Sequence, residues 1–498
     1  MELRFEKKIC KCLRRNVWEV QDQEQTQEVK LSDGMPDIGS ILAAWGQCVM
    51  RGKEWLGDGM SVSGGVMAWV LYAPADGTEP RVVETWLPMK LRWSFAEAQR
   101  EGTIRTSWLL KGVDARVLSA RKMMVRGWEG VLGEAVEPQE VDIYGAEQVP
   151  EDVQLLRRTY PAQVPMEAGE KVFPIDEELR FPTGTVAPER LVSYSLTLHP
   201  AEQKVVGGKI VFRGSADLHL VYHGTDGQLH CCDMDAPYSQ YADLDRDYDK
   251  EATAQIMMAV SSLEPEIQEG GIRLKCGLVA QYLICDRMML ELVEDAYSPR
   301  RSVDVQTQEL KIPMVLDTRR ENLHCEAVVG TDAMRVVDAW VYPEHPTVRR
   351  TGDRTELGVS GNAQALYYDG NGDLRGGSVR WDDQREYPVG EDAVAQPQVR
   401  DVSRPQISAV GGQVGLRSDI QTETVTTGRQ GIPMVTGITL GEMKRPDPNR
   451  PSLLLRRAEE GSLWELAKRS GSTVDAIRMA NGLDDGPLDD RLLLIPVS

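Results

Sequence analysis

Apolar and polar residues alternate along much of this chain, and the clearest stretch runs from residue 209 to residue 222. Side chains of a β-strand point alternately to its two faces, so a period of two predicts a long strand with one face buried. The apolar positions are Ile210, Phe212, Ala216, Leu218, Leu220 and Tyr222, and the polar ones are Lys209, Arg213, Ser215, Asp217 and His219.

A related pattern recurs three times, at residues 62–72, 212–222 and 359–368. The glycines inside the three copies lie 150 and 147 residues apart. Each copy runs into an Asp-Gly pair, a sequence that tolerates the positive φ of a tight hairpin turn. Because a repeated unit sets domain count and fold class together, we expect three copies of one β fold.

Strand-rich units with many Gly and Asp turns are typical of antiparallel two-layer domains. We therefore predict a mainly β protein with three tandem β-sandwich-like repeats, at residues 1–150, 151–300 and 301–443. Helices should be rare within them. The best candidate is a helical turn at residues 35–42, where Pro36 and Asp37 suit a helix start before an apolar stretch.

The pattern changes after residue 443. Residues 444–452 hold three prolines and are predicted to form an extended linker without a core of its own. Residues 453–498 then show helical spacing in two short stretches, with a helix end at Ser470-Gly471 and a helix start at Ser472-Thr473. Leucine-rich runs flank the two stretches, which predicts a small α+β domain with the order strand, helix, helix, strand.

Charge and composition exclude several classes of partner. Lys and Arg total 57 against 77 Asp and Glu, and the net charge of −20 repels nucleic acid phosphates and anionic lipid. No stretch of 18 apolar residues occurs, and the N-terminus lacks the apolar segment of a signal peptide. We predict no nucleic acid partner, no transmembrane segment and a cytoplasmic location. The eight cysteines show no disulfide spacing.

The sequence lacks the common phosphate-binding, zinc-protease and nucleophile-elbow motifs, so we expect no enzyme activity, no catalytic residues, no cofactor and no metal. Asp369–Asp373 imitates the start of a calcium loop without its later ligands, and a hairpin turn is favoured. The densest group of candidate metal ligands is His219, His223, His230, Cys231, Cys232 and Asp233. Alternation places His219 and His223 on one outward face of the strand. We favour solvated strand residues over metal ligands for this group.

Four short motifs mark the C-terminal domain: Gly461-Ser462-Leu463-Trp464, Leu466-Ala467, Asn481-Gly482-Leu483 and Ile495-Pro496. Together they resemble the LysM module, a family that binds polymers of N-acetylglucosamine, although the first motif is one residue shorter than the family's Gly-Asp-Thr-Leu. Beside Leu463 and Leu466, Trp464 is interpreted as a core residue. The resemblance implies a partner- or glycan-binding surface at Gly461, Ser462, Leu463, Asn481, Gly482 and Leu483.

Residues 31–42, LSDGMPDIGSIL, and residues 113–118, VDARVL, resemble the SPOCS domain of spore-coat assembly proteins. Three such repeats before one LysM module resemble clostridial coat-morphogenesis proteins over nearly the whole chain. The resemblance implies a non-enzymatic assembly scaffold in the mother cell, at the forespore surface. It would dock through its tail and repeats onto the coat-basement ATPase and other coat proteins. The alternative is a peptidoglycan-binding protein anchored through the LysM module, and the missing export signal favours docking.

Overall fold

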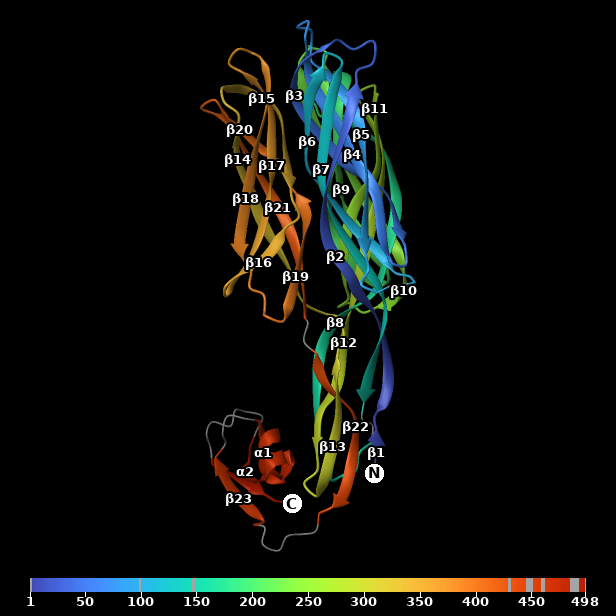
Figure 1. The fold of residues 1–498 in the computed structure, drawn as a ribbon, viewed down its shortest axis with the longest axis vertical. Helices are drawn as coiled ribbons and strands as arrows, with labels where there is room; N and C mark the ends of the chain where they lie inside the picture. Colours follow the sequence, from blue (N-terminus) through green and yellow to red (C-terminus); the bar gives the residue numbers. More distant parts are fainter. Residues whose placement is uncertain are drawn as a thin grey trace.

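The computed structural model describes residues 2–97, 100–145, 148–428, 431–444, 451–457, 462–483 and 492–497. The described part of the chain is mainly β, as predicted, with two short helices near the C-terminus. Figure 1 shows long β lobes side by side above a narrower bundle of strands, with the two helices beside that bundle.

The first unit contains a three-stranded antiparallel sheet in the order β2-β7-β6 and a second in the order β3-β4-β5. The two sheets face each other across a shared core that includes Val66 and Ala68 of β4 and Val113 of β6. The strands are β1 (Glu2–Arg4), β2 (Glu6–Lys30), β3 (Ile38–Trp55), β4 (Gly59–Pro74), β5 (Arg81–Ser94), β6 (Thr103–Ser119) and β7 (Lys122–Gly145).

The second unit repeats this order, with β8-β12-β11 in place of β2-β7-β6. Its β9 reverses direction near Gly207 (φ +57°). The two ends of β9 consequently lie side by side, and the N–H of Thr225, just after the strand, donates to the carbonyl of Ala187, just before it (3.0 Å). The two halves of β9 and its partner β10 thus replace β3-β4-β5. The strands are β8 (Gln154–Arg180), β9 (Pro188–Gly224), β10 (Leu229–Tyr248), β11 (Thr253–Gln268) and β12 (Gly271–Tyr297).

In the third unit, β21 pairs with β14, β19 and β20, whereas β17 pairs with β15, β16 and β18. Side chains from both sheets share one core, including Leu323, Ala363 and Leu416. The strands are β13 (Arg301–Leu310), β14 (Met314–Val329), β15 (Ala333–Pro343), β16 (Thr347–Thr351), β17 (Arg354–Asp369), β18 (Leu374–Glu386), β19 (Ala393–Val402), β20 (Gln406–Val410), β21 (Gln413–Gly428) and β22 (Ile432–Met443). The boundaries at residues 150, 300 and 443 stay predictions.

Below the lobes, the three units contribute one ribbon each to a bundle that we call the stalk (Figure 1). The stalk consists of β1, β13 and β22 together with residues 6–12, 139–145, 154–165 and 285–297 of β2, β7, β8 and β12. Its buried core includes Cys12 from the first unit, Leu292 from the second and Met434 from the third. The ribbons therefore bury their apolar faces against one another.

The residues after 451, which we call the tail, form β23 (Leu453–Arg457), α1 (Leu463–Ser470), α2 (Val474–Asn481) and β24 (Leu492–Pro496). The side chains of Ser462 and Thr473 cap the two helix starts by accepting from the N–H groups of Glu465 and Ala476. Each helix ends at a glycine in the left-handed region, Gly471 or Gly482. Neither helix has the length and apolar character needed to cross a membrane.

The helical turn predicted at residues 35–42 is wrong. Ile38 begins strand β3, and its N–H donates to the carbonyl of Ala120 (2.8 Å). The preceding turn is held from outside, because the guanidinium of Arg121 donates to the carbonyl of Ser32 (2.8 Å). This hydrogen bond from a distant part of the chain stabilises the turn. The β-branched residues that follow the turn favour a strand.

Candidate functional site

The tail is fixed to the end of the stalk. Trp464 donates its indole N–H to Asp295 Oδ2 of β12 (2.7 Å), and its ring meets Tyr297 edge to face at 4.7 Å. Lys468 of α1 places its Nζ 2.9 and 2.7 Å from the two oxygens of Asp295. Tyr297 also donates its hydroxyl to the carbonyl of Ser472 (3.0 Å). Trp464 is buried, as interpreted, and it serves both the tail core and this contact.

The six residues implied by the LysM resemblance have separate structural roles in the tail. Gly461 lies outside the described residues, Ser462 caps α1, and Leu463 and Leu483 are half-buried against the tail core. Gly482 has φ +58°, and no atom lies within 4 Å of the point where a Cβ would stand. The use of these positions for binding stays a prediction.

Asn481 is engaged within the tail by its whole amide group. Its Nδ2 donates to the carbonyls of Ile477 (2.8 Å) and Leu494 (2.6 Å). Its Oδ1 accepts the N–H of Leu494 at 2.7 Å. The side chain thereby ties the end of α2 to β24, which makes it a structural residue of the tail.

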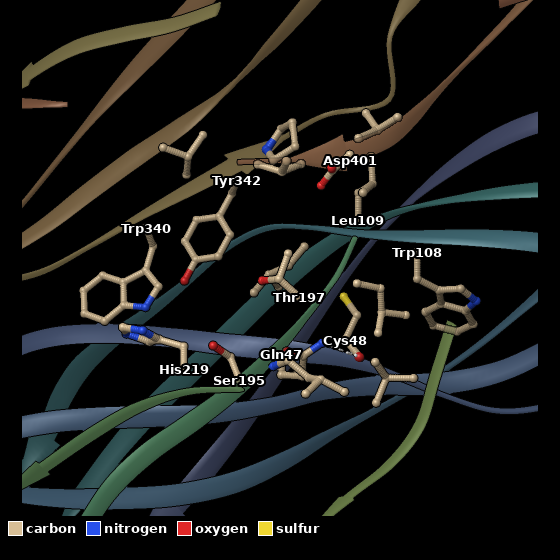
Figure 2. Close-up of a pocket in the computed structure, with 18 of the residues that line it drawn as sticks. Gln47, Cys48, Trp108, Leu109, Ser195, Thr197, His219, Trp340, Tyr342 and Asp401 are labelled. Carbon is tan, nitrogen blue, oxygen red and sulfur yellow. Dashed lines mark hydrogen bonds between the residues drawn. The ribbon is translucent and has the colours of Figure 1, made fainter. Parts of the chain in front are cut away.

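A cavity of about 370 Å³ lies where the three units meet, and we call it the junction cavity. Its walls come from β3 and β6 of the first unit, β9, β10 and β11 of the second, and β15 and β19 of the third. Figure 2 shows Cys48, Trp108, Thr197, Tyr342 and Asp401 around it. The cavity therefore brings together residues that are far apart in the sequence.

At one wall of the cavity, His219 of β9 bridges the second and third units. Its Nδ1 lies 2.5 Å from Asp233 of β10, and its Nε2 lies 2.8 Å from Asp338 of β15. Burial alone lowers the pKa of an imidazole, but the charges and hydrogen bonds of the two carboxylates raise the pKa of His219 to about 10. The ring is thus an imidazolium held between two aspartates at neutral pH.

A second histidine makes a similar bridge. His199 of β9 places Nδ1 2.6 Å from Asp401 of β19 and Nε2 3.2 Å from Asp217. The hydrogen bond to Asp401 raises the pKa of His199. Arg404, which follows β19, lies 2.8 Å from Asp233 of β10. Paired charges therefore join the second and third units at several points.

The expectation of a solvated histidine face on β9 is wrong. His223 and Cys232 are buried and His219 is half-buried, whereas Cys231 is exposed. His230 is half-buried and pairs with Asp226 at 3.0 Å. Alternation within one strand marks its polar face but does not reveal that other parts of the molecule cover that face, Asp338 of the third unit at His219 and residues 79–81 of the first unit at His223. Within the described part of the chain, no three His, Cys, Asp or Glu side chains gather in a group that could hold a metal ion.

The hairpin interpretation of residues 369–373 is confirmed, since they connect the paired strands β17 and β18. Asp369 Oδ1 accepts the N–H groups of Asn371 (3.0 Å) and Asp373 (2.9 Å). Gly372 adopts φ +83°, a value that glycine reaches at little cost. The carboxylate of Asp369 thus stabilises the turn itself.

Buried charges that the sequence reasoning missed lock the units together. Glu134 of β7 is fully buried and accepts from Arg105 of β6 at 2.7 Å and from Arg15 of β2 at 2.5 Å. Arg105 also donates to the carbonyl of Gln255 in the second unit (3.1 Å). In the same region, Gln281 of β12 exchanges two 2.9 Å hydrogen bonds with the backbone of Thr106. In the sequence, these buried ion pairs are indicated only by charged residues that interrupt apolar strand stretches.

Aromatic pairs complete the contacts between units. Trp45 of β3 stacks on Trp340 of β15 with ring centroids 4.8 Å apart. Trp69 of β4 meets Tyr194 of β9 edge to face at 5.0 Å. With the buried charges, these rings make the three units one packed body. Comparison with protein-family models, curated proteins and solved structures finds no match for this chain.

Proposed function

We propose that this chain is a non-enzymatic scaffold for assembly of the spore coat. It works in the mother cell at the forespore surface and docks onto the coat-basement ATPase and other coat proteins through its tail and its repeats. The proposal starts from the resemblance of residues 31–42 and 113–118 to SPOCS domains and of the tail to a LysM module.

One observation carries the proposal: the tail is held at the end of the stalk by the contacts of Asp295 and Tyr297 with Trp464, Lys468 and Ser472. A module fixed in this way is presented in one orientation by a body whose three units are locked together. Such an arrangement suits a spacer that sets the distance between a partner docked on the tail and a protein in contact with the lobes. Because the tail is already held in place, less entropy is lost when the partner binds.

The same contacts weigh against the peptidoglycan alternative. Trp464 would have to stack on a sugar ring, but it is buried against Tyr297 and donates to Asp295. The amide of Asn481 would have to meet an N-acetyl group, but its donors and acceptor are used by Ile477 and Leu494. Both side chains that could recognise an N-acetylated sugar therefore serve the fold.

The test compares the full chain with a variant that ends at residue 443. Each purified protein is titrated against the purified coat-basement ATPase in solution and, separately, against insoluble peptidoglycan. We expect saturable binding of the full chain to the ATPase, at least tenfold weaker binding of the shortened chain, and retention of neither on peptidoglycan. Saturable retention on peptidoglycan without ATPase binding would replace the proposal with the alternative. Circular dichroism checks that the shortened chain stays folded.

A further inference from the structure

The junction cavity is large enough to hold a small molecule. Its volume is about 370 Å³, and ligand-binding cavities in proteins commonly span roughly 300 to 1,000 Å³. Strands of all three units form its walls, and the space between domains is a common position for a ligand. Cys231 of β10 and Ile407 of β20 line the cavity and are exposed, so a ligand can enter from solvent.

Much of the cavity wall is apolar. Met257 and Val260 of β11 and Leu110 of β6 are buried residues of this wall. Trp108 of β6 and Trp340 of β15 add half-buried aromatic rings. Because the burial of apolar surface favours binding, such a wall favours a ligand with an apolar body.

Every ionised side chain that lines the junction cavity already has a partner of opposite charge. The pairs are His219 with Asp233 and Asp338, Arg404 with Asp233, Asp401 with His199, and Arg400 with Glu423. A charged ligand would therefore leave water without gaining an unpaired group of opposite charge, and this desolvation is costly. The wall favours an uncharged ligand.

The hydroxyl of Tyr342 on β15 is a buried group of the wall whose proton has no acceptor. Tyr342 is 8% exposed, and its hydroxyl has no hydrogen-bond partner among the described residues. The backbone N–H of Gly46 faces the same oxygen, but an N–H can only donate. Burial raises the pKa of Tyr342, so the phenol keeps its proton. Because an unpaired buried donor is costly, this hydroxyl favours a ligand that carries an acceptor.

The position of Tyr342 makes its hydroxyl available inside the cavity. Figure 2 shows the ring extending from β15, with its hydroxyl end directed toward Ser195, Thr197 and His219 of β9. His219 cannot accept the proton, because aspartates engage both of its ring nitrogens. The indole nitrogen of Trp108 also lacks a partner among the described residues, but Figure 2 shows it turned away from the other labelled residues. The Tyr342 hydroxyl is therefore the group that orients a ligand.

We propose that the junction cavity binds an uncharged small molecule with an apolar body and a carbonyl oxygen that accepts the proton of the Tyr342 hydroxyl. The apolar body lies against the wall formed by β6, β11 and β15. A ligand in this position contacts all three units at once, so its binding stabilises their packing. The inference does not depend on the docking function, because it concerns the lobes and not the tail.

The experiment uses the full chain and prodan, an uncharged naphthyl ketone whose fluorescence shifts to shorter wavelength in apolar surroundings. We expect saturable binding with such a shift. Acetylnaphthalene, which keeps the ketone and the apolar body, should displace prodan. Naphthoate, which carries a negative charge, should not displace it. Hydrogen exchange of the chain with bound prodan should slow in β6, β11 and β15, which locates the probe in the cavity.

Two substitutions test the assigned contacts. Tyr342→Phe keeps the ring and removes the hydroxyl, so prodan should bind about three- to tenfold more weakly, as expected for the loss of one hydrogen bond. Thr197→Trp adds bulk to the cavity wall and should abolish binding. The matched control is Tyr387→Phe, because the hydroxyl of Tyr387 is also buried without a partner among the described residues but does not line the cavity. It should bind prodan normally.

Circular dichroism verifies that each variant is folded, and a Thr197→Trp variant that fails to fold leaves the decision to Tyr342→Phe. Absence of saturable binding by the wild type overturns the proposal, and so does equal affinity of the wild type and Tyr342→Phe. Displacement by naphthoate as strong as that by acetylnaphthalene overturns the uncharged class of ligand. Equal weakening in Tyr387→Phe would place the probe in the core of the third unit and overturn the assigned site.

Discussion

The surroundings of two side chains, Glu129 and His219, move the pKa of each far from its ordinary value. Glu129 of β7 is fully buried, its Oε2 accepts from the thiol of Cys48 (3.1 Å), and burial raises its pKa to about 7. His219 is held between two aspartates, which raise its pKa to about 10. These two residues make the stability of the fold depend on pH in adjoining windows.

Glu129→Gln should stabilise the protein above pH 7. In the unfolded chain the carboxyl of Glu129 ionises from about pH 4.5 upward, whereas in the folded protein it stays neutral until about pH 7. The folded state therefore loses stability as the pH rises from 4.5 to 7. The neutral amide avoids this cost, which is on the order of 3 kcal/mol at pH 8. Urea unfolding at pH 5 and pH 8 measures the difference, with the exposed Glu24→Gln as the control. An equal effect at both pH values would show that charge is not the cause.

His219→Gln should destabilise the protein most below pH 6.5. The raised pKa means that the contribution of the imidazolium is complete below pH 6.5 and disappears as the pH rises through about 10. The difference in unfolding free energy between wild type and variant should therefore shrink from pH 6 to pH 10. His324→Gln is the matched control, because His324 also pairs with an aspartate (2.7 Å to Asp419) but at the surface. A difference that is constant with pH would assign His219 a packing role only.

At the scale of elements, the sequence predicts strands and caps well because both depend on neighbouring residues. The alternation at residues 209–222 predicts the second half of β9, and Ser470 to Thr473 predict the break between α1 and α2. The turn at residues 32–37 was misread because a distant side chain, Arg121, holds it. The reversal of β9 near Gly207 was likewise not predicted, since Gly-Gly within a long strand pattern also fits a bulge.

The candidate site was less predictable than the fold. The Leu453–Leu455 and Leu492–Ile495 runs predict the two tail strands, but a uniform apolar run does not show which of its residues a helix covers. Four of those six leucines prove to be exposed, because both helices lie on one face of the ribbon. The role of Asn481 in holding β24 depends on a contact across 13 residues, which the local pattern does not contain.

Asn481→Ala should loosen the tail without affecting the lobes. The variant loses three hydrogen bonds and leaves backbone groups of Leu494 without these partners, a cost on the order of 1 to 3 kcal/mol. Hydrogen exchange of the full chain should speed up in α2 and β24 and stay unchanged in the three units. Gly482→Asn provides the control, since asparagine tolerates the left-handed backbone at that position. Equal acceleration in the control would point to general sensitivity of the tail instead.

At the scale of the whole molecule, the three units touch along their lobes and again in the stalk, and the tail joins the stalk at its end. This arrangement corrects the picture of a tail that a linker keeps apart from the repeats. Residues 445–450 of that linker lie outside the described residues, but the tail itself contacts β12 of the second unit. Sequence periodicity gave no sign of this docking, because Asp295 and Tyr297 belong to a different unit from Trp464.

Asp295→Ala should release the tail from the stalk while leaving both folded. Asp295 accepts the indole N–H of Trp464 and the ammonium of Lys468, and its loss removes charge-assisted hydrogen bonds around a half-buried carboxylate. A loss of about 2 kcal/mol is expected after allowing for solvent around Lys468, equivalent to roughly a thirtyfold shift in the docking equilibrium. Hydrogen exchange should then quicken at the α1 surface and at residues 295–297, with the tail core still protected.

The matched control is Glu291→Ala on the same strand, where an exposed carboxylate lies 3.7 Å from Arg157 at the surface of the stalk. Its exchange pattern should equal that of the wild type, because an exposed pair contributes little. Unchanged exchange in Asp295→Ala would mean that the ring contact between Tyr297 and Trp464 holds the tail without the carboxylate. Release with retained ATPase affinity would show that the partner needs only the tail. Release with weakened affinity would show that the stalk must also present the tail in a fixed orientation.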